Sequence, residues 1–426
     1  MGYATTISGG PAAAPQAAAR PGPRAGGKPG GPRRRGRAAA AKAAFVPGPS
    51  AVPMRIPLSR PHLAGTEDAC VAEALASGHV GQAGPQLDAF EAAVAARLGA
   101  GVHCIALASI TAARHLALRL AGVGAGDEVW LAAASDVACA RAVLDRGARL
   151  RLFDGAPAGW TIDPALVAAE LDAAARAGRL PRAILPADLC GQSVDLAPLE
   201  AAAAFHGVAL VVDAAGSLGA TAGDGRCAGS GGDASLIAFG GDNVVTTSGG
   251  AVLATRSAEL AQRAQALCPP GTAGDERLSN VSAAIGLAQM AVLDLRVAQR
   301  RAVFDRYRAA LARPGVGFMP EPAGFRSTRW LTAMTLDPAV LGVGPEDLRR
   351  MLHDHGIEAR RLRRPLHLQP AFEGVAHVGR GFDAWLCAHG LCLPSGSDLT
   401  PSEQGEVIDR IACFLDAPRR WSAAAG

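Results

Sequence analysis

The chain has 426 residues, enough for two domains that each bury a sizeable core. Hydrophobic residues make up 49% and charged residues 19%, as in ordinary globular proteins. No apolar run is long enough to span a bilayer. The first basic residues are not followed by the apolar segment of a secretory signal. We therefore expect a cytoplasmic protein.

The formal net charge of +4 conceals an asymmetry. Residues 1–53 hold eight basic side chains and no acid, whereas the remainder holds 34 basic and 38 acidic residues. The first segment is rich in Ala, Gly and Pro and cannot bury enough apolar surface to offset its ordering entropy, so we predict a disordered basic tail. A solvated tail and a start codon placed upstream of Met54 are both open interpretations. The mildly acidic remainder does not suggest a nucleic-acid surface.

Nine cysteines are scattered along the chain, and none forms a Cys-x-x-Cys pair. An odd count without a pairing pattern predicts reduced thiols that serve as small core residues. We therefore expect neither a disulfide framework nor a metal site built on them.

From residue 86 onward, short apolar runs alternate with helical patterns. One helix is predicted from Thr111, where Ala113, Leu116, Ala117 and Leu120 share one face. The other predicted helices span residues 136–146, 164–177 and 197–206. Strands are predicted at residues 102–107, 128–132, 149–153, 183–186, 209–212, 235–239 and 250–254. This alternation predicts an α/β fold with a mostly parallel sheet sandwiched by helices.

A long helical region at about residues 280–312 follows and leads to a smaller C-terminal α+β domain. That domain contains a segment at residues 318–336 and a helix at residues 344–355. We predict three parts: the tail at 1–53, a large domain at 54–295 and a small domain at 296–420.

Seven short stretches share their order and spacing with one known family. They are residues 56–61 (Ile-Pro-Leu-Ser-Arg-Pro), 122–129, 246–250 (Thr-Thr-Ser-Gly-Gly), 277–280 (Arg-Leu-Ser-Asn), 284–289, 365–370 and 392–397. Over residues 55–415 the chain resembles the DegT/StrS-type nucleotide-sugar aminotransferases, which depend on pyridoxal phosphate (PLP). The resemblance implies the fold-type I fold of PLP transferases, with sites built at a dimer interface.

The chemistry of that family needs a lysine that forms a Schiff base with PLP. The resemblance places it just before Thr-Thr-Ser-Gly-Gly, and in this chain the position is Asn243. An amide nitrogen is not nucleophilic, and the whole chain contains only Lys28 and Lys42, both in the predicted tail. A coding bias toward arginine explains the scarcity of lysine, but it does not explain an asparagine here. We therefore predict no catalytic residue at this position.

The other contacts implied by the resemblance have changed as well. The helix start that holds the phosphate reads Ser-Ile-Thr-Ala at residues 109–112 instead of Ser-Gly-Thr-Ala, which leaves Thr111 and Ala112 as residual cofactor contacts. Five other residues of the family's site are replaced in this chain. Asp136 stands at the position of the ring-stacking aromatic residue, Ala238 at that of the phosphate-binding serine, and Asp275 at that of the asparagine from the neighbouring subunit. Asp188 and Cys190 stand where the family has a His and a Tyr after another strand. Asp136 is expected to place a carboxylate where the face of the pyridine ring would rest.

Asp213 is the one retained contact, because it matches the aspartate that pairs with the protonated pyridine nitrogen. The residue three positions later, usually Glu, Gln or His, is Gly216. A strand-end aspartate also suits a structural role, such as capping the following turn, so both interpretations of Asp213 stay open.

Our leading hypothesis is an aminotransferase-like pseudoenzyme of nucleotide-sugar or polysaccharide biosynthesis that uses no cofactor. It would bind a nucleotide sugar or support an active homologue. One alternative is a lysine-independent aminotransferase or dehydratase that uses PLP or pyridoxamine phosphate (PMP). Another is a cofactor-free enzyme in which Asp136, Asp188 and Asp213 form a carboxylate cluster with metal-ligand character.

We also predict a dimer, either with itself or with an active homologue. The apolar positions after residue 280 include Ile285, Leu287, Met290 and Leu293, which exceed one narrow helix face. The alternative is that all of them pack inside their own domain.

Overall fold

The computed structural model describes residues 54–269 and 276–417. The predicted tail, with Lys28 and Lys42, lies outside these residues, and so does Asp275. The division into domains at residue 295 stays a prediction. All nine cysteines lie within the described residues, and five of them are buried as the sequence predicted for small core residues, namely Cys104, Cys139, Cys190, Cys268 and Cys392, whereas Cys413 is exposed.

An eight-stranded sheet forms the larger layer, in the order β1-β7-β6-β5-β4-β2-β3-β11. Neighbouring strands from β6 to β11 are parallel, and β7 is antiparallel to both β1 and β6. All seven predicted strands are present, with ends within one residue of those expected. The strands are β1 (His103–Leu107), β2 (Glu128–Ala132), β3 (Arg149–Phe153), β4 (Ala183–Leu185), β5 (Ala209–Asp213), β6 (Ala234–Ala238), β7 (Ala251–Thr255) and β11 (Ala376–Val378).

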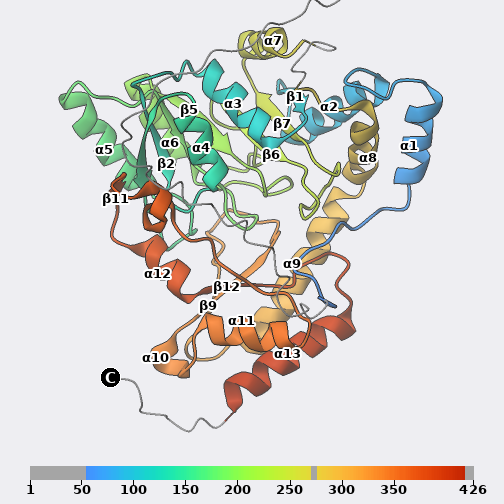
Figure 1. Cartoon of the computed structure of the whole chain (residues 1–426), viewed down its shortest axis with the longest axis vertical. Coiled ribbons are helices and arrows are strands. Elements are labelled where there is room, and N and C mark those ends of the chain that lie inside the picture. The colour runs from blue at the N-terminus through green and yellow to red at the C-terminus, as the bar shows by residue number, and fades with distance from the viewer. Residues whose placement is uncertain (1–53, 270–275, 418–426) are drawn as a thin grey trace, which may run out of the picture. The chain divides into compact units, whose positions relative to one another are not determined.

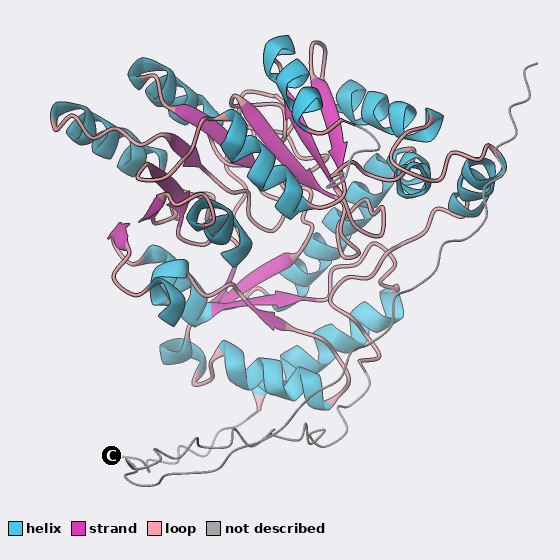
Figure 2. Ribbon diagram, turned by 45° about the horizontal axis from the view of Figure 1, so that its top comes forward, coloured by secondary structure: helices cyan, strands magenta, loops and turns pink. Residues whose placement is uncertain are grey.

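Helices cover both faces of this sheet, which confirms the predicted sandwich (Figures 1 and 2). In β5, Leu210 and Val212 point into one apolar core and Val211 into the other, so successive side chains serve opposite faces. One core is closed by α2 (Pro85–Leu98), α5 (Pro164–Arg176) and α6 (Leu196–His206). The other is closed by α3 (Ile110–Leu120), α4 (Val137–Leu144) and α7 (Ala258–Leu267).

Side-chain caps fix where several helices begin. Ser109 accepts a hydrogen bond from the backbone of Ala112 and starts α3, and Asp136 accepts one from Ala138 and starts α4. These two helices therefore begin in the loops that follow β1 and β2, at the edge where the parallel strands end.

The helical region predicted at residues 280–312 is two helices, which corrects the expectation of one long element. α8 (Asn280–Met290) and α9 (Leu293–Leu311) meet at a 62° bend. In the described part of the chain no single helix is long and apolar enough to cross a bilayer, and α8 and α9 meet that criterion only as this bent pair.

A four-stranded antiparallel sheet forms the smaller layer, in the order β10-β12-β9-β8. Figure 1 shows α9 running from the large sheet toward this sheet, with α11 and α13 beside it. Side chains of these three helices and of β9 share one core, including Tyr307, Leu352, Ile411 and Met334. The elements are β8 (Val316–Phe318), β9 (Thr332–Leu336), α10 (Pro338–Leu341), α11 (Pro345–Asp354), β10 (Arg360–Arg361), β12 (Gly390–Leu393) and α13 (Pro401–Asp416).

Two segments of the chain connect the two sheets. Ile56 bridges to Ile357 and is buried in the core of the smaller sheet, whereas β11 pairs with β3 in the large one. The remaining helical elements are α1 (Glu67–Ala76), the 3₁₀ turns Leu366–Leu368 and Pro370–Phe372, and α12 (Phe382–His389). These crossings hold the smaller layer against the strand ends of the larger one.

Candidate functional site

The candidate site lies where the carboxyl ends of β2, β4, β5 and β6 meet the start of α3. Ligand sites of α/β sheets form at this edge, because the loops after parallel strands converge there. Asp213 is the last residue of β5, Asp188 follows β4, and Asn243 lies in the loop between β6 and β7. The structure therefore brings the sequence-predicted positions to one edge of the sheet.

Asp213 is paired inside the protein with Arg114 of α3. Its Oδ2 atom accepts hydrogen bonds from Nη2 of Arg114 at 2.8 Å, from Nε at 3.1 Å and from the Cys139 thiol at 2.9 Å. Oδ1 accepts from the backbone N–H of Ala215 at 3.2 Å. Only 4% of Asp213 and 5% of Arg114 is exposed. Burial opposes the charge of Arg114, but the Asp213 carboxylate outweighs it and raises the pKa of the guanidinium.

The start of α3 is satisfied by its own cap. Ser109 Oγ accepts the N–H of Ala112 at 3.1 Å, so this donor is engaged within the protein, and Thr111 is exposed. Arg114 is the fifth residue of α3 and is buried. The buried carboxylate of Asp213 supplies the charge partner that this cation needs inside the protein.

Asn243 is also engaged. Its Nδ2 donates to the carbonyl oxygen of Ala238 at 2.8 Å, which ties the loop back to the end of β6. Next to it, the Trp330 indole N–H donates to the carbonyl oxygen of Asp242 at 2.7 Å. A cavity of about 10 Å³ lined by Gly216, Ala238 and Asn243 has room for roughly one water.

Trp330 explains why a glycine stands at position 216. A Cβ atom at Gly216 would lie 2.5 Å from Cε3 of the Trp330 ring. The indole thus occupies the space into which a side chain at this position would extend. It joins the loop after β5 to the loop that carries Asn243.

The half-buried carboxyl group of Asp188 and the buried one of Asp383 line a second cavity of about 10 Å³ at the same edge. Burial raises the pKa of Asp188 to about 7, against hydrogen bonds from Ser217 and Val194. Burial and the charge of Asp154 raise the pKa of Asp383 to about 7. Both groups therefore change charge close to neutral pH.

The predicted carboxylate cluster does not form. Asp136 caps α4 and lies 3.2 Å from Arg363, Asp188 accepts from Ser217 and Val194, and Asp213 pairs with Arg114. Within residues 54–269 and 276–417, no three His, Cys, Asp or Glu side chains are placed to hold one metal ion. The three aspartates share the strand-end edge, but each is committed to its own partner.

Comparison with known proteins identifies this arrangement. Residues 61–412 match the DegT/DnrJ/EryC1/StrS aminotransferase family. The chain belongs to this family. EpsN of Bacillus subtilis, named as a pyridoxal phosphate-dependent aminotransferase, is 37% identical over 388 residues, which are 87% of this chain and 99% of EpsN. GDP-perosamine synthase of Caulobacter vibrioides is 31% identical and matches 85% of this chain and 98% of its own.

Solved structures agree with the family. The aminotransferase TlmJ from Streptoalloteichus hindustanus is 30% identical with a TM-score of 0.76, covering 84% of this chain and 98% of its own. An aminotransferase of the family from Brucella abortus is 26% identical with a TM-score of 0.75, covering 83% of this chain and 96% of its own. The chain therefore has the fold of PLP-dependent DegT-type aminotransferases.

The cleft of this family member does not fit PLP as the resemblance describes its binding. Asn243 has no nucleophilic nitrogen, and its amide already donates to Ala238. Asp213, the retained partner of the pyridine nitrogen, already holds the guanidinium of Arg114. The N–H of Ala112, predicted as a residual phosphate contact, is used by the cap of α3. The Schiff-base, ring and phosphate positions are each changed or occupied by the protein itself.

Sequence reasoning missed three residues of this site. Arg114 lies three residues before Ala117, which is on the apolar face predicted for this helix, and a cation at that spacing was a detectable signal. Trp330 and Asp383 reach the strand ends from the C-terminal part of the chain. No local pattern predicts those long-range contacts.

Proposed function

We propose that this chain is a non-catalytic aminotransferase-like protein of nucleotide-sugar or polysaccharide biosynthesis. It forms no Schiff base and uses neither PLP nor PMP. The observation that carries the proposal is the buried pair of Arg114 and Asp213, because the carboxylate needed by a pyridinium already has a cation of the protein itself. Asn243 at the Schiff-base position supports the same conclusion from a second side of the cleft.

In this proposal Asp213 is a structural residue. It joins β5, α3 and α4 through Arg114 and Cys139, and the protein's own side chains take the places that a cofactor would otherwise fill. The scaffold is kept for binding, with a nucleotide sugar as the ligand and the cytoplasm as the compartment.

Reductive trapping tests this proposal. The full-length protein is incubated with PLP, reduced with borohydride, digested and analysed by mass spectrometry. We expect no pyridoxyl adduct within residues 54–426, which contain no lysine, whereas adducts at Lys28 and Lys42 show that the reduction worked. A labelled peptide from residues 54–426, or conversion of a 4-keto nucleotide sugar to an amino sugar, would refute the proposal.

The lysine-independent PLP or PMP enzyme is the second candidate, and the retained Asp213 and the family's PLP dependence favour it. Such an enzyme would have to separate Arg114 from Asp213 before the carboxylate could serve a pyridine ring. Turnover of a 4-keto nucleotide sugar with PMP, without any covalent adduct, would support this candidate over the first.

We further propose that the protein acts as a dimer, with itself or with an active homologue. Of the positions from which the sequence predicted a dimer, Leu293 is buried in its own domain and Ile285, Leu287 and Met290 are partly buried, so they no longer carry the argument. Four other large apolar side chains on or near α1 and the start of α9 are more than half exposed: Leu63, Leu75, Val80 and Leu295. Burial against a neighbour would remove them from water. Light scattering should give about twice the chain mass of 43.1 kDa, and Leu295→Glu should reduce it whereas Phe205→Glu on α6 should not. A monomer at micromolar concentration, with no mass change on adding an active homologue, would contradict this proposal.

A further inference from the structure

A cavity of about 380 Å³ lies between α9, β8 and the segment that leads into β9, away from the strand-end site. Its size falls within the range of small-ligand pockets. Its walls carry more charge than is usual for such a pocket. The side chains that matter are Arg301, Phe304, Asp305, Arg308, Glu321 and Arg329.

Arg329 is a buried cation in this cavity wall. Its side chain is only 4% exposed, and its guanidinium carbon lies 3.8 Å from the centroid of the Phe304 ring. Nη1 donates to the carbonyl oxygen of Met319 at 2.9 Å. The backbone of Arg329 has a φ of 52°, which costs free energy for a residue other than glycine. The fold thus holds a strained residue that keeps a guanidinium in this place.

The acidic side chains of the cavity compensate the other two arginines first. Glu321 accepts two hydrogen bonds from Arg301, at 2.6 and 3.0 Å, and its distance of 3.9 Å to Arg329 is too long for a hydrogen bond. Asp305 pairs with Arg308 at 3.3 Å, and both side chains are more than half exposed. Three cations and two carboxylates leave one positive charge in excess.

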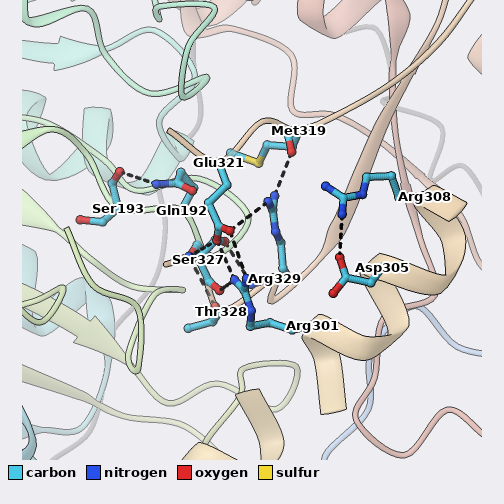
Figure 3. A network of polar contacts seen from close by, with 11 residues as sticks. Gln192, Ser193, Arg301, Asp305, Arg308, Met319, Glu321, Ser327, Thr328 and Arg329 are labelled. Atoms are coloured by element: carbon cyan, nitrogen blue, oxygen red, sulfur yellow. Dashed lines mark hydrogen bonds and ion pairs between the residues drawn. The ribbon is translucent and has the colours of Figure 1, made fainter. Parts of the chain in front are cut away.

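Arg308 and Arg329 both line this cavity. In Figure 3 the guanidinium of Arg308 points toward the side on which Arg329 lies. Both guanidiniums also lie against the ring of Phe304, Arg308 at 5.7 Å from its centroid. Burial, joined by the charges of Arg301 and Arg308, lowers the pKa of Arg329 to about 10, against the opposing charge of Glu321. An anion bound in the cavity would offset this excess of positive charge.

We propose that this cavity is a binding site for the phosphate or diphosphate group of a small ligand. Arg308 and Arg329 donate to its oxygens, because planar guanidinium groups match the geometry of phosphate and their hydrogen bonds to it are charge-assisted. Arg301 is a positioning residue, since its fork is taken by Glu321 and the carbonyl oxygen of Ser327. The site is independent of the strand-end cleft and of the function proposed for it.

Calorimetric titration of the full-length protein tests the site. The probes are inorganic phosphate, inorganic pyrophosphate and UDP, each compared with sodium chloride at equal ionic strength. We expect saturable binding of pyrophosphate at one site. UDP bound more tightly than pyrophosphate would identify a nucleotide as the ligand, and equal affinity would identify the free phosphate group.

Two exposed arginines of α9 give a matched pair of variants. Arg308→Gln should weaken pyrophosphate binding by about tenfold or more, the loss expected for a charge-assisted hydrogen bond. Arg306→Gln should leave binding unchanged, because Arg306 donates to the carbonyl oxygen of Pro401 instead. Urea midpoints of both variants show that they are folded. Absence of saturable binding for all three probes, or equal losses in the two variants, would overturn the proposal.

Discussion

Replacing Arg114 by leucine should destabilise the protein strongly, because it leaves the buried carboxylate of Asp213 without its cation. Asp213 is 4% exposed and would lose the two hydrogen bonds that Arg114 donates at 2.8 and 3.1 Å. Removing one partner of a buried ion pair costs about 3–5 kcal/mol, since the remaining charge is neither paired nor hydrated. The hydrogen bonds from Cys139 and Ala215 remain, so we expect the lower half of that range.

The double variant Arg114→Leu/Asp213→Asn separates the charge effect from loss of packing. It removes both charges, keeps a side chain of similar shape at residue 213, and should recover most of the lost stability. Arg119→Leu on the exposed face of the same helix is the matched control and should change stability by less than about 0.5 kcal/mol.

Urea unfolding followed by circular dichroism measures all three variants at one pH. An Arg114→Leu variant within about 1 kcal/mol of the parent protein would show that the ion pair does not hold the cleft together. A double variant no more stable than the single one would show that packing, not charge, carries the loss.

Two further predictions concern the same cleft. The folded-state pKa values of Asp188 and Asp383 are about 7, above the usual 3.8. The free energy of unfolding should therefore fall as pH rises from about 4 to 7 and stay lower above pH 7. Between pH 5 and pH 8 each carboxyl group should lower the free energy of unfolding by about 2–3 kcal/mol. Asp188→Asn and Asp383→Asn should each reduce this pH dependence in urea titrations. The control Asp294→Asn should not, because the side chain of Asp294 is 80% exposed. If the free energy of unfolding changed with pH equally in all three variants and the parent protein, the raised pKa values would be wrong. Asn243→Lys alone should not restore transamination, because Arg114 still pairs with Asp213 and Ala238 supplies no hydroxyl. Measurable turnover of a 4-keto nucleotide sugar by this variant would show that the pairing of Asp213 and the missing hydroxyl matter less than we infer.

The large sheet was predictable because its strands are short buried runs between helices. Seven strands were found from sequence, but β11 was not, since three residues, Ala-His-Val, carry no pattern of their own. The bend between α8 and α9 was also missed. Ala291 and Val292 contain no helix breaker, so the break depends on packing rather than on local propensity.

The candidate site was predictable at positions that the motifs shared with the family align, such as Asn243 and Asp213. Their partners were not, because hydrogen bonds join residues far apart in the chain. Arg114 precedes Asp213 by 99 positions, and Trp330 follows Asp242 by 88. The carboxylate cluster of the cofactor-free alternative is absent for the same reason, because a sequence shows that acids share a sheet edge but not which partners they meet there.

Equilibrium dialysis of the full-length protein against PLP and PMP tests the central claim most directly. Arg114 pairs with Asp213, and the amide of Asn243 donates to Ala238, so we predict no saturable uptake of either compound in the strand-end cleft at micromolar concentration, that is, none that Asp213→Asn abolishes. Any slow labelling by PLP should map to Lys28 and Lys42. Saturable uptake of one PLP or PMP per chain, abolished by Asp213→Asn, would contradict the account.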